Sequence, residues 1–183
     1  MSKQDRIAAF IGNLPTDSRF DPCYTGYFTC FNACEYYEAH DVLEHLWLKT
    51  TGGHRNFYKA LIQLAGAFVH LQKQRARPDH PKDGRRLHPA VRLFRLAQSN
   101  LSPYPDHYLG LDLSAVRSLA NQMVSEIEES DCRINPWTFQ NAPKLHLILQ
   151  EPEPRLDVKA GCLGRQAQPS GLMEGKDAKA EGK

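Results

Sequence analysis

Apolar residues recur every three or four positions through most of residues 31–129, the spacing of one face of an α-helix. This pattern and its flanking residues predict four main helices and a short earlier one. Their approximate ranges are 7–14, 31–49, 55–74, 89–101 and 112–129. Strand-like alternation is confined to three leucines within residues 145–149. We therefore predict an all-α fold, a compact bundle of about four to six helices.

The helix over residues 31–49 has the clearest predicted start. Asn32 is a good N-cap residue, and Glu35 follows three positions later, as in a capping box. Phe31 and Tyr36 have the spacing of a hydrophobic staple. Glycines at residues 52–53 then end the helix. Because this connection is short, we expect the helices on either side of it to be antiparallel neighbours.

The composition changes near residue 150. The chain of 183 residues is 41% hydrophobic and 24% charged with a formal net charge of +2, which is typical of a globular protein. Residues 151–183 hold no aromatic residue and only sparse apolar ones. These cannot offset the entropy of ordering the chain, about 1–2 kcal/mol per residue. We predict a helical domain over residues 5–150 and a disordered tail over residues 151–183.

Several features bear on the cellular compartment. The longest apolar run, residues 60–69, is shorter than the roughly 18 residues of a membrane-spanning helix. Residues 1–6 carry charges of both signs and lack the apolar core of a secretory signal. Five cysteines without framework spacing favour reduced thiols. Together they predict a cytoplasmic protein.

Polar side chains interrupt the apolar faces of two adjacent predicted helices. At about 100° per residue, His40, Glu44 and Trp47 share one face of the first helix. Gln63 and His70 lie among small residues on the second. An unpartnered buried polar group costs about 1–3 kcal/mol, so each of these side chains needs a partner. We therefore expect them to meet in a buried cluster between the two helices.

Three interpretations of this cluster stay open. The first is a structural hydrogen-bond network that fixes helix register. The second is a site for a divalent metal ion, zinc, iron or manganese, with His40, Glu44 and His70 as ligands. The third is metal-free acid/base catalysis by the same residues, in which Glu44 sets the tautomer or raises the pKa of His40. In the last two, the pocket would be lined by Trp47, Gln63 and Tyr37.

Basic residues are concentrated within residues 73–95, where eight Lys or Arg stand against two Asp, a local charge of +6. Proline and glycine punctuate residues 75–89, which indicates a loop. The alternative function is accordingly a non-catalytic interaction domain that binds an acidic protein or nucleic acid through this region. The expected contact residues are Arg75, Arg77, Lys82, Arg85 and Arg86.

The helices that carry these polar residues resemble a known family. Residues 40–47 have the pattern His-x-x-x-Glu-x-x-Trp, and residues 61–65 read Leu-Ile-Gln-Leu-Ala, with His70 following. This combination resembles the bacterial and archaeal domain-of-unknown-function family 309 over about residues 25–125, in a longer form similar to members from photosynthetic bacteria. One departure is Asp41, which stands where many members have Glu. The resemblance implies a compact helical bundle and assigns no activity.

Overall fold

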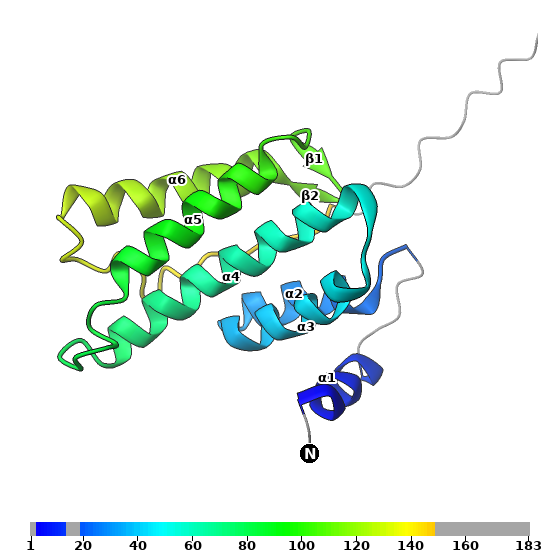
Figure 1. Cartoon of the computed structure of the whole chain (residues 1–183), viewed down its shortest axis with the longest axis horizontal. Helices are drawn as coiled ribbons and strands as arrows, with labels where there is room; N and C mark the ends of the chain where they lie inside the picture. Colours follow the sequence, from blue (N-terminus) through cyan, green and yellow to red (C-terminus); the bar gives the residue numbers. More distant parts are fainter. Residues whose placement is uncertain (1–2, 14–18, 149–183) are drawn as a thin grey trace, which may run out of the picture. The chain divides into compact units, whose positions relative to one another are not determined.

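The computed structural model describes residues 3–13 and 19–148. Within this part of the chain it confirms the all-α prediction, because six α-helices are accompanied only by a two-stranded sheet (Figure 1). The helices are α1 (Lys3–Gly12), α2 (Pro22–Asn32), α3 (Tyr36–Lys49), α4 (Arg55–Ala76), α5 (Leu87–Leu101) and α6 (Leu113–Glu129). The predicted tail over residues 151–183 lies outside the described residues.

Helix α2 is a correction to the sequence prediction, which starts a helix at residue 31. Asp21 caps α2 by accepting a hydrogen bond from the Cys23 amide at 2.8 Å, and Pro22 occupies the first turn. Asn32, the predicted N-cap of the next helix, is the last residue of α2. Its side-chain amide instead bonds the backbone of Leu145 through both its nitrogen and its oxygen, each at 2.8 Å.

The junction between α2 and α3 is closed by a Schellman motif. Cys34 has a left-handed backbone with φ of 63°. The Cys34 amide donates to the Phe31 carbonyl at 3.0 Å, and the Glu35 amide donates to the Cys30 carbonyl at 2.9 Å. This turn delays the start of α3 to Tyr36 and sets the direction in which α3 leaves α2.

Helix α4 lies between α3 and α5 and packs against both (Figure 1). Its bounds agree with the predicted helix over residues 55–74, and its apolar stripe is fully buried. A single-turn 3-10 helix, η1 (Gly52–His54), connects it to α3, so these two helices are neighbours as expected. Helix α6 also confirms its predicted start, because the Asp112 carboxylate accepts from the Ala115 amide at 3.0 Å.

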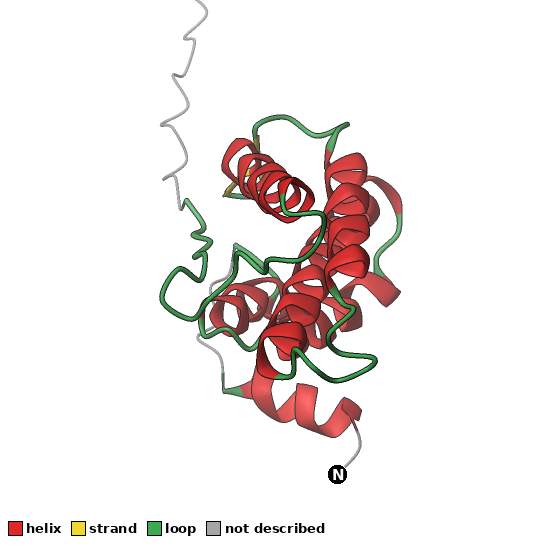
Figure 2. Ribbon diagram, turned by 90° about the vertical axis from the view of Figure 1, so that its left-hand side faces the viewer, coloured by secondary structure: helices red, strands yellow, loops and turns green. Residues whose placement is uncertain are grey.

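A short β-hairpin and a long irregular segment complete the fold. Strands β1 (His107–Tyr108) and β2 (Leu111–Asp112) pair antiparallel between α5 and α6. After α6 the chain runs back over the bundle without a helix, as Figure 2 shows. Asn135 anchors this segment by donating to the Leu71 carbonyl of α4 at 2.8 Å. The predicted extended segment therefore covers the core.

The connection between α4 and α5 is organised around one buried carboxylate. Asp83 accepts from Arg86 Nε at 2.8 Å, and Arg77 Nη1 lies 3.4 Å from its second oxygen. A Cβ on Gly84 would collide with the carbonyl oxygen of Pro78, so this turn requires glycine. The predicted loop is thus tied together by ion pairs. Two of the arginines expected to contact an acidic partner are paired within it.

Across residues 3–13 and 19–148, no helix combines the length and apolarity that crossing a membrane requires.

Candidate metal centre

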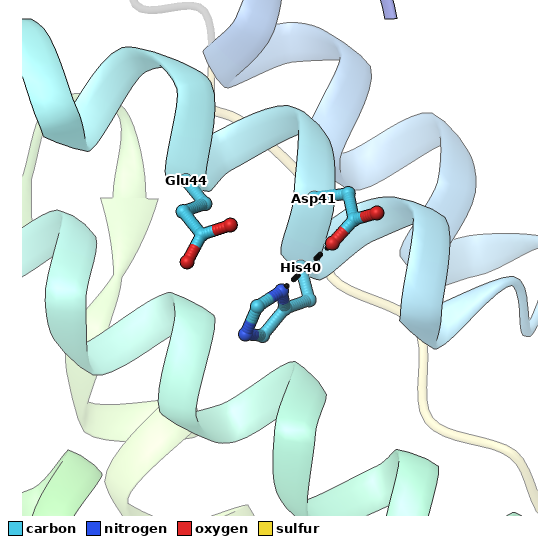
Figure 3. A group of neighbouring side chains, drawn as sticks. All are labelled: His40, Asp41 and Glu44. Atoms are coloured by element: carbon cyan, nitrogen blue, oxygen red, sulfur yellow. Dashed lines mark hydrogen bonds and ion pairs between the residues drawn. The ribbon is translucent and has the colours of Figure 1, made fainter. Parts of the chain in front are cut away.

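His40, Asp41 and Glu44 form a group of potential metal ligands on α3. One ligand atom from each residue lies within 4.8 Å of those of the other two. His40 and Glu44 are one helical turn apart, and Figure 3 shows both side chains extending from α3 toward α4. The Asp41 carboxylate lies beside the His40 ring (Figure 3). The group therefore combines one imidazole and two carboxylates.

A hydrogen bond orients the His40 ring. His40 Nδ1 lies 3.2 Å from Asp41 Oδ1, and Asp41 is only 6% exposed. The sequence interpretation gives the orienting role to Glu44, but the observed partner of Nδ1 is Asp41. When Nδ1 carries the proton, Nε2 keeps a free lone pair and can bind a metal ion or accept a proton. The His40 side chain remains 31% exposed, so Nε2 need not be sealed in the core.

The predicted cluster differs from the observed one in its burial. His40, Glu44 and Trp47 are half-buried, as are Gln63 and His70. The expectation of a fully buried cluster is therefore wrong. The physical reason lies in the rotation of α3, whose fully buried stripe consists of aromatic and aliphatic residues. That stripe contains Tyr36, Ala39 and Leu43. The polar face next to it lies at the margin of the core.

Gln63 and His70 make their observed contacts on the α5 side of α4. Gln63 Oε1 accepts from Asn100 of α5 at 2.8 Å. His70 Nδ1 lies 3.2 Å from Nη1 of Arg86, which directly precedes α5. Asp41, not His70, joins His40 and Glu44 in the group of potential ligands found among the described residues. The structure thus brings two of the three predicted ligands together and adds a third from the same helix.

His70 has a perturbed pKa that explains its contact. Burial, followed by the positive charges of Arg86, Lys73 and Arg92, lowers the pKa to about 4. The imidazole is therefore neutral near pH 7. Because guanidinium can only donate, Nδ1 of the neutral ring is the acceptor of the Arg86 hydrogen bond.

The indole donor of Trp47 is buried. Its Nε1 atom has no hydrogen-bond acceptor among residues 3–13 and 19–148. The Arg55 guanidinium lies 4.3 Å from the centre of the Trp47 ring and donates to the Trp47 carbonyl at 3.1 Å. Buried donors are rarely left unsatisfied, and Trp47 follows Glu44 by three residues on α3. Trp47 therefore lies on the same face of α3 as Glu44.

A cavity of about 170 Å³ adjoins the group of ligands. Asp41 and Tyr37 line it, together with the apolar side chains of Ile7 and Phe10 from α1. The Tyr37 ring is 52% exposed and stacks on the His40 imidazole with an interplanar angle of 15°. Tyr37, a predicted pocket residue, thus borders both the cavity and the imidazole.

Asp41 is the residue that sequence reasoning missed. It is buried next to Val42 on α3, although aspartate is seldom buried without a partner. The available signal was its position directly after His40, because its neighbours one helical turn away, Tyr37, Glu38, Glu44 and His45, do not form an apolar stripe.

A comparison with known families matches residues 24–78 to the family described as Domain of unknown function (DUF309). This range contains α3, α4 and the three grouped side chains of His40, Asp41 and Glu44. Searches of curated proteins and of solved structures gave no match. The match supports the resemblance seen in the sequence over residues 24–78, where the chain is similar to the DUF309 family.

Proposed function

We propose that the face of α3 carrying His40, Asp41 and Glu44 binds a divalent metal ion beside a small-molecule pocket. The observation that carries this proposal is the approach of three ligand atoms to within 4.8 Å of one another. Donors on one tetrahedral ion, each about 2.1 Å from it, lie about 3.4 Å apart, so side-chain rotation suffices to close the site.

The donor set suits zinc, iron or manganese. Imidazole and carboxylate ligands are shared by these ions, whereas a thiolate-rich site would favour other metals. Asp41 has two compatible roles, as a direct ligand or as the group that orients His40 for binding through Nε2. Either arrangement leaves coordination positions for water or a substrate oxygen, and such a site supports Lewis-acid or acid/base chemistry.

The neighbouring cavity supports binding of an organic ligand. The cavity has a volume of about 170 Å³, and the carboxylates of Glu35, Glu38 and Asp41 line it beside its apolar side chains. Ile7 and Phe10 provide apolar surface, and Asp41 belongs to both the cavity wall and the ligand group. A ligand bound there would have its polar end next to His40.

Metal analysis of the protein prepared without chelator or affinity tag tests the proposal. Elemental analysis and titration with zinc, ferrous iron and manganese should give about one ion per chain. His40→Ala and Glu44→Gln should abolish this stoichiometric binding. Two controls, His45→Ala on α3 and Glu129→Gln at an exposed position of α6, should retain it because neither residue belongs to the ligand group or lines the neighbouring cavity. A folded wild-type protein that binds none of the three metals would refute the metal site.

The alternative is a non-catalytic interaction domain in which these polar residues serve the structure. Asp41 and Glu44 each take part in at least one further interaction within the protein, so a metal ion would compete with existing contacts. Gln63 and His70 also have partners. In this case metal would be absent, His40→Ala would mainly lower thermal stability, and an acidic partner would bind the exposed cations. Those cations are Arg75, Lys82 and Arg85.

A further inference from the structure

We infer that a second site, between α5 and the C-terminal end of α6, binds a small organic phosphate. It stands apart from the candidate metal centre and does not depend on the function proposed for that centre. The site is a cavity of about 350 Å³, within the range of about 300–1,000 Å³ typical of small-molecule pockets.

Three basic side chains of α5 line the cavity. His88, Arg92 and Arg95 are spaced four and three residues apart, so they lie along one face of the helix. Arginine suits phosphate because its planar guanidinium can donate two parallel hydrogen bonds. These residues belong to the basic region of the sequence, but they lie on α5 and not in the loop that precedes it.

The cations of this face differ in how far they are already neutralised. Arg95 Nη2 contacts both carboxylate oxygens of Glu128 in α6, at 2.8 and 2.7 Å. Arg92 is exposed and makes no ion pair with any residue that the structure describes. The two arginines and Glu128 together leave one positive charge at the cavity. Arg92 is therefore the main anchor for an incoming anion, and Arg95 is an anchor held in place by Glu128.

The potential around Arg92 is positive beyond the cavity itself. Lys73, Arg86 and Arg92 all act on His70, and each of them lowers the pKa of that imidazole. Arg86 is partly offset by Asp83, whereas Lys73 and Arg92 are not paired with an acid among the described residues. The positive field is confined to the Arg92 end of the cavity, where it favours anions, because Glu128 and Asp131 act with the opposite sign on Cys132.

The remaining wall is apolar, which favours an organic phosphate over a bare ion. Val91 is buried and Leu96 is 43% exposed, so both can contact a flat hydrophobic group. Cys132 also lines the cavity. Burial, followed by the charges of Glu128 and Asp131, raises the pKa of its thiol, which is therefore neutral and adds to the apolar surface.

Titration of the full chain with phenyl phosphate, followed by amide NMR shifts and calorimetry, tests this site. Phenyl phosphate should bind saturably and more tightly than inorganic phosphate or phenol, because it alone uses both the cations and the apolar wall. Arg92→Gln should weaken binding about tenfold, the effect of losing a charged hydrogen bond. Arg75→Gln removes an equal charge from an exposed position that does not line the cavity, and should change affinity less than about twofold.

In a second pair of variants, one should bind phenyl phosphate more tightly and the other should serve as its control. Glu128→Gln removes the carboxylate that competes for Arg95 and should tighten phenyl phosphate binding about threefold. Glu129→Gln, its exposed neighbour outside the cavity, should leave the affinity unchanged. The site is overturned if phenyl phosphate fails to saturate, if inorganic phosphate binds equally well, or if Arg92→Gln and Arg75→Gln have equal effects. Tighter binding of a single-stranded oligonucleotide, reduced equally by both arginine variants, would overturn it in favour of a diffuse polyanion surface.

Discussion

Nη1 of Arg86 lies 3.2 Å from Nδ1 of His70, which joins the end of the α4–α5 connection to the middle of the bundle. Arg86 also pairs with the buried Asp83 through its other nitrogens, at 2.8 and 2.7 Å. The arginine therefore bridges a neutral imidazole acceptor and a carboxylate. This bridge holds only while His70 stays unprotonated, so it makes the stability of the fold depend on pH.

Acid should destabilise the protein through His70. The folded-state pKa of about 4 lies below the ordinary value of 6.5, so in this window the unfolded chain binds more protons than the native one. The free energy of unfolding should therefore fall as the pH drops from about 6.5 to about 4, by about 2–3 kcal/mol in total. Urea unfolding across this range measures the slope.

His70→Gln should flatten that slope, because glutamine can still accept from Arg86 but cannot be protonated. His88→Gln is the matched control, because it also replaces one histidine by glutamine but at an exposed position. If both variants keep the wild-type slope, His70 is not the group responsible.

Asp83→Asn should lower the thermal midpoint by loosening the connection between α4 and α5. The substitution removes the negative charge that faces Arg86 and Arg77 but preserves the size of the side chain. Asp79→Asn makes the same chemical change at an exposed position of the same loop and should have little effect. Equal midpoints for the two variants would contradict an organising role for Asp83.

The pKa of Asp83 predicts a further, separate acid transition. The hydrogen bond from Arg86, with the charges of Arg86, Arg77 and His80, holds this pKa below its ordinary value of 3.8. The stabilisation it provides is present above that value and is lost as the pH falls through the folded-state pKa. Protonation of Asp83 therefore lowers the free energy of unfolding only at the acid end of the titration, in addition to the decrease caused by His70. Asp83→Asn should remove this second decrease.

Asn32→Asp distinguishes the observed role of Asn32 from the predicted one. At an N-cap, aspartate and asparagine are nearly equivalent. In the structure, Asn32 donates to the Leu145 carbonyl, and a carboxylate would instead face that oxygen. We expect a loss of about 1–3 kcal/mol in the free energy of unfolding. Asn121→Asp is the control, because among the described residues the Asn121 side chain accepts a hydrogen bond from Gln98 and donates none.

Asn32 was predicted to cap a helix but is the last residue of α2, and this difference shows where sequence patterns are reliable. Helices α4 and α6 were predictable because each has a regular apolar stripe and a recognisable start or stop. Helix α2 was not, because its side chains are buried on most of its surface and it therefore lacks the alternation of apolar and polar faces. The cap pattern at residues 31–36 then marked the wrong boundary.

The candidate site could also be predicted only in part from the sequence. Helical spacing places His40 and Glu44 on one face from sequence alone. The partners of Gln63 and His70 depend on which helix packs against the far side of α4, and no local pattern encodes that choice. The sequence thus indicated the residues that need partners, while the packing of α5 decided what Gln63 and His70 contact.

Trp137 should be the strongest anchor of the segment that follows α6. It is 1% exposed, and its indole Nε1 donates to the Tyr36 hydroxyl at 3.0 Å. Trp137→Ala would leave a cavity and remove the indole donor from the buried Tyr36 hydroxyl, so the free energy of unfolding should fall by about 3–5 kcal/mol. Phe139→Ala, at a side chain 66% exposed, should cost less than about 1 kcal/mol. Chemical denaturation of both variants gives the comparison. Near-equal losses would mean that residues 131–148 do not rely on this contact to cover the core.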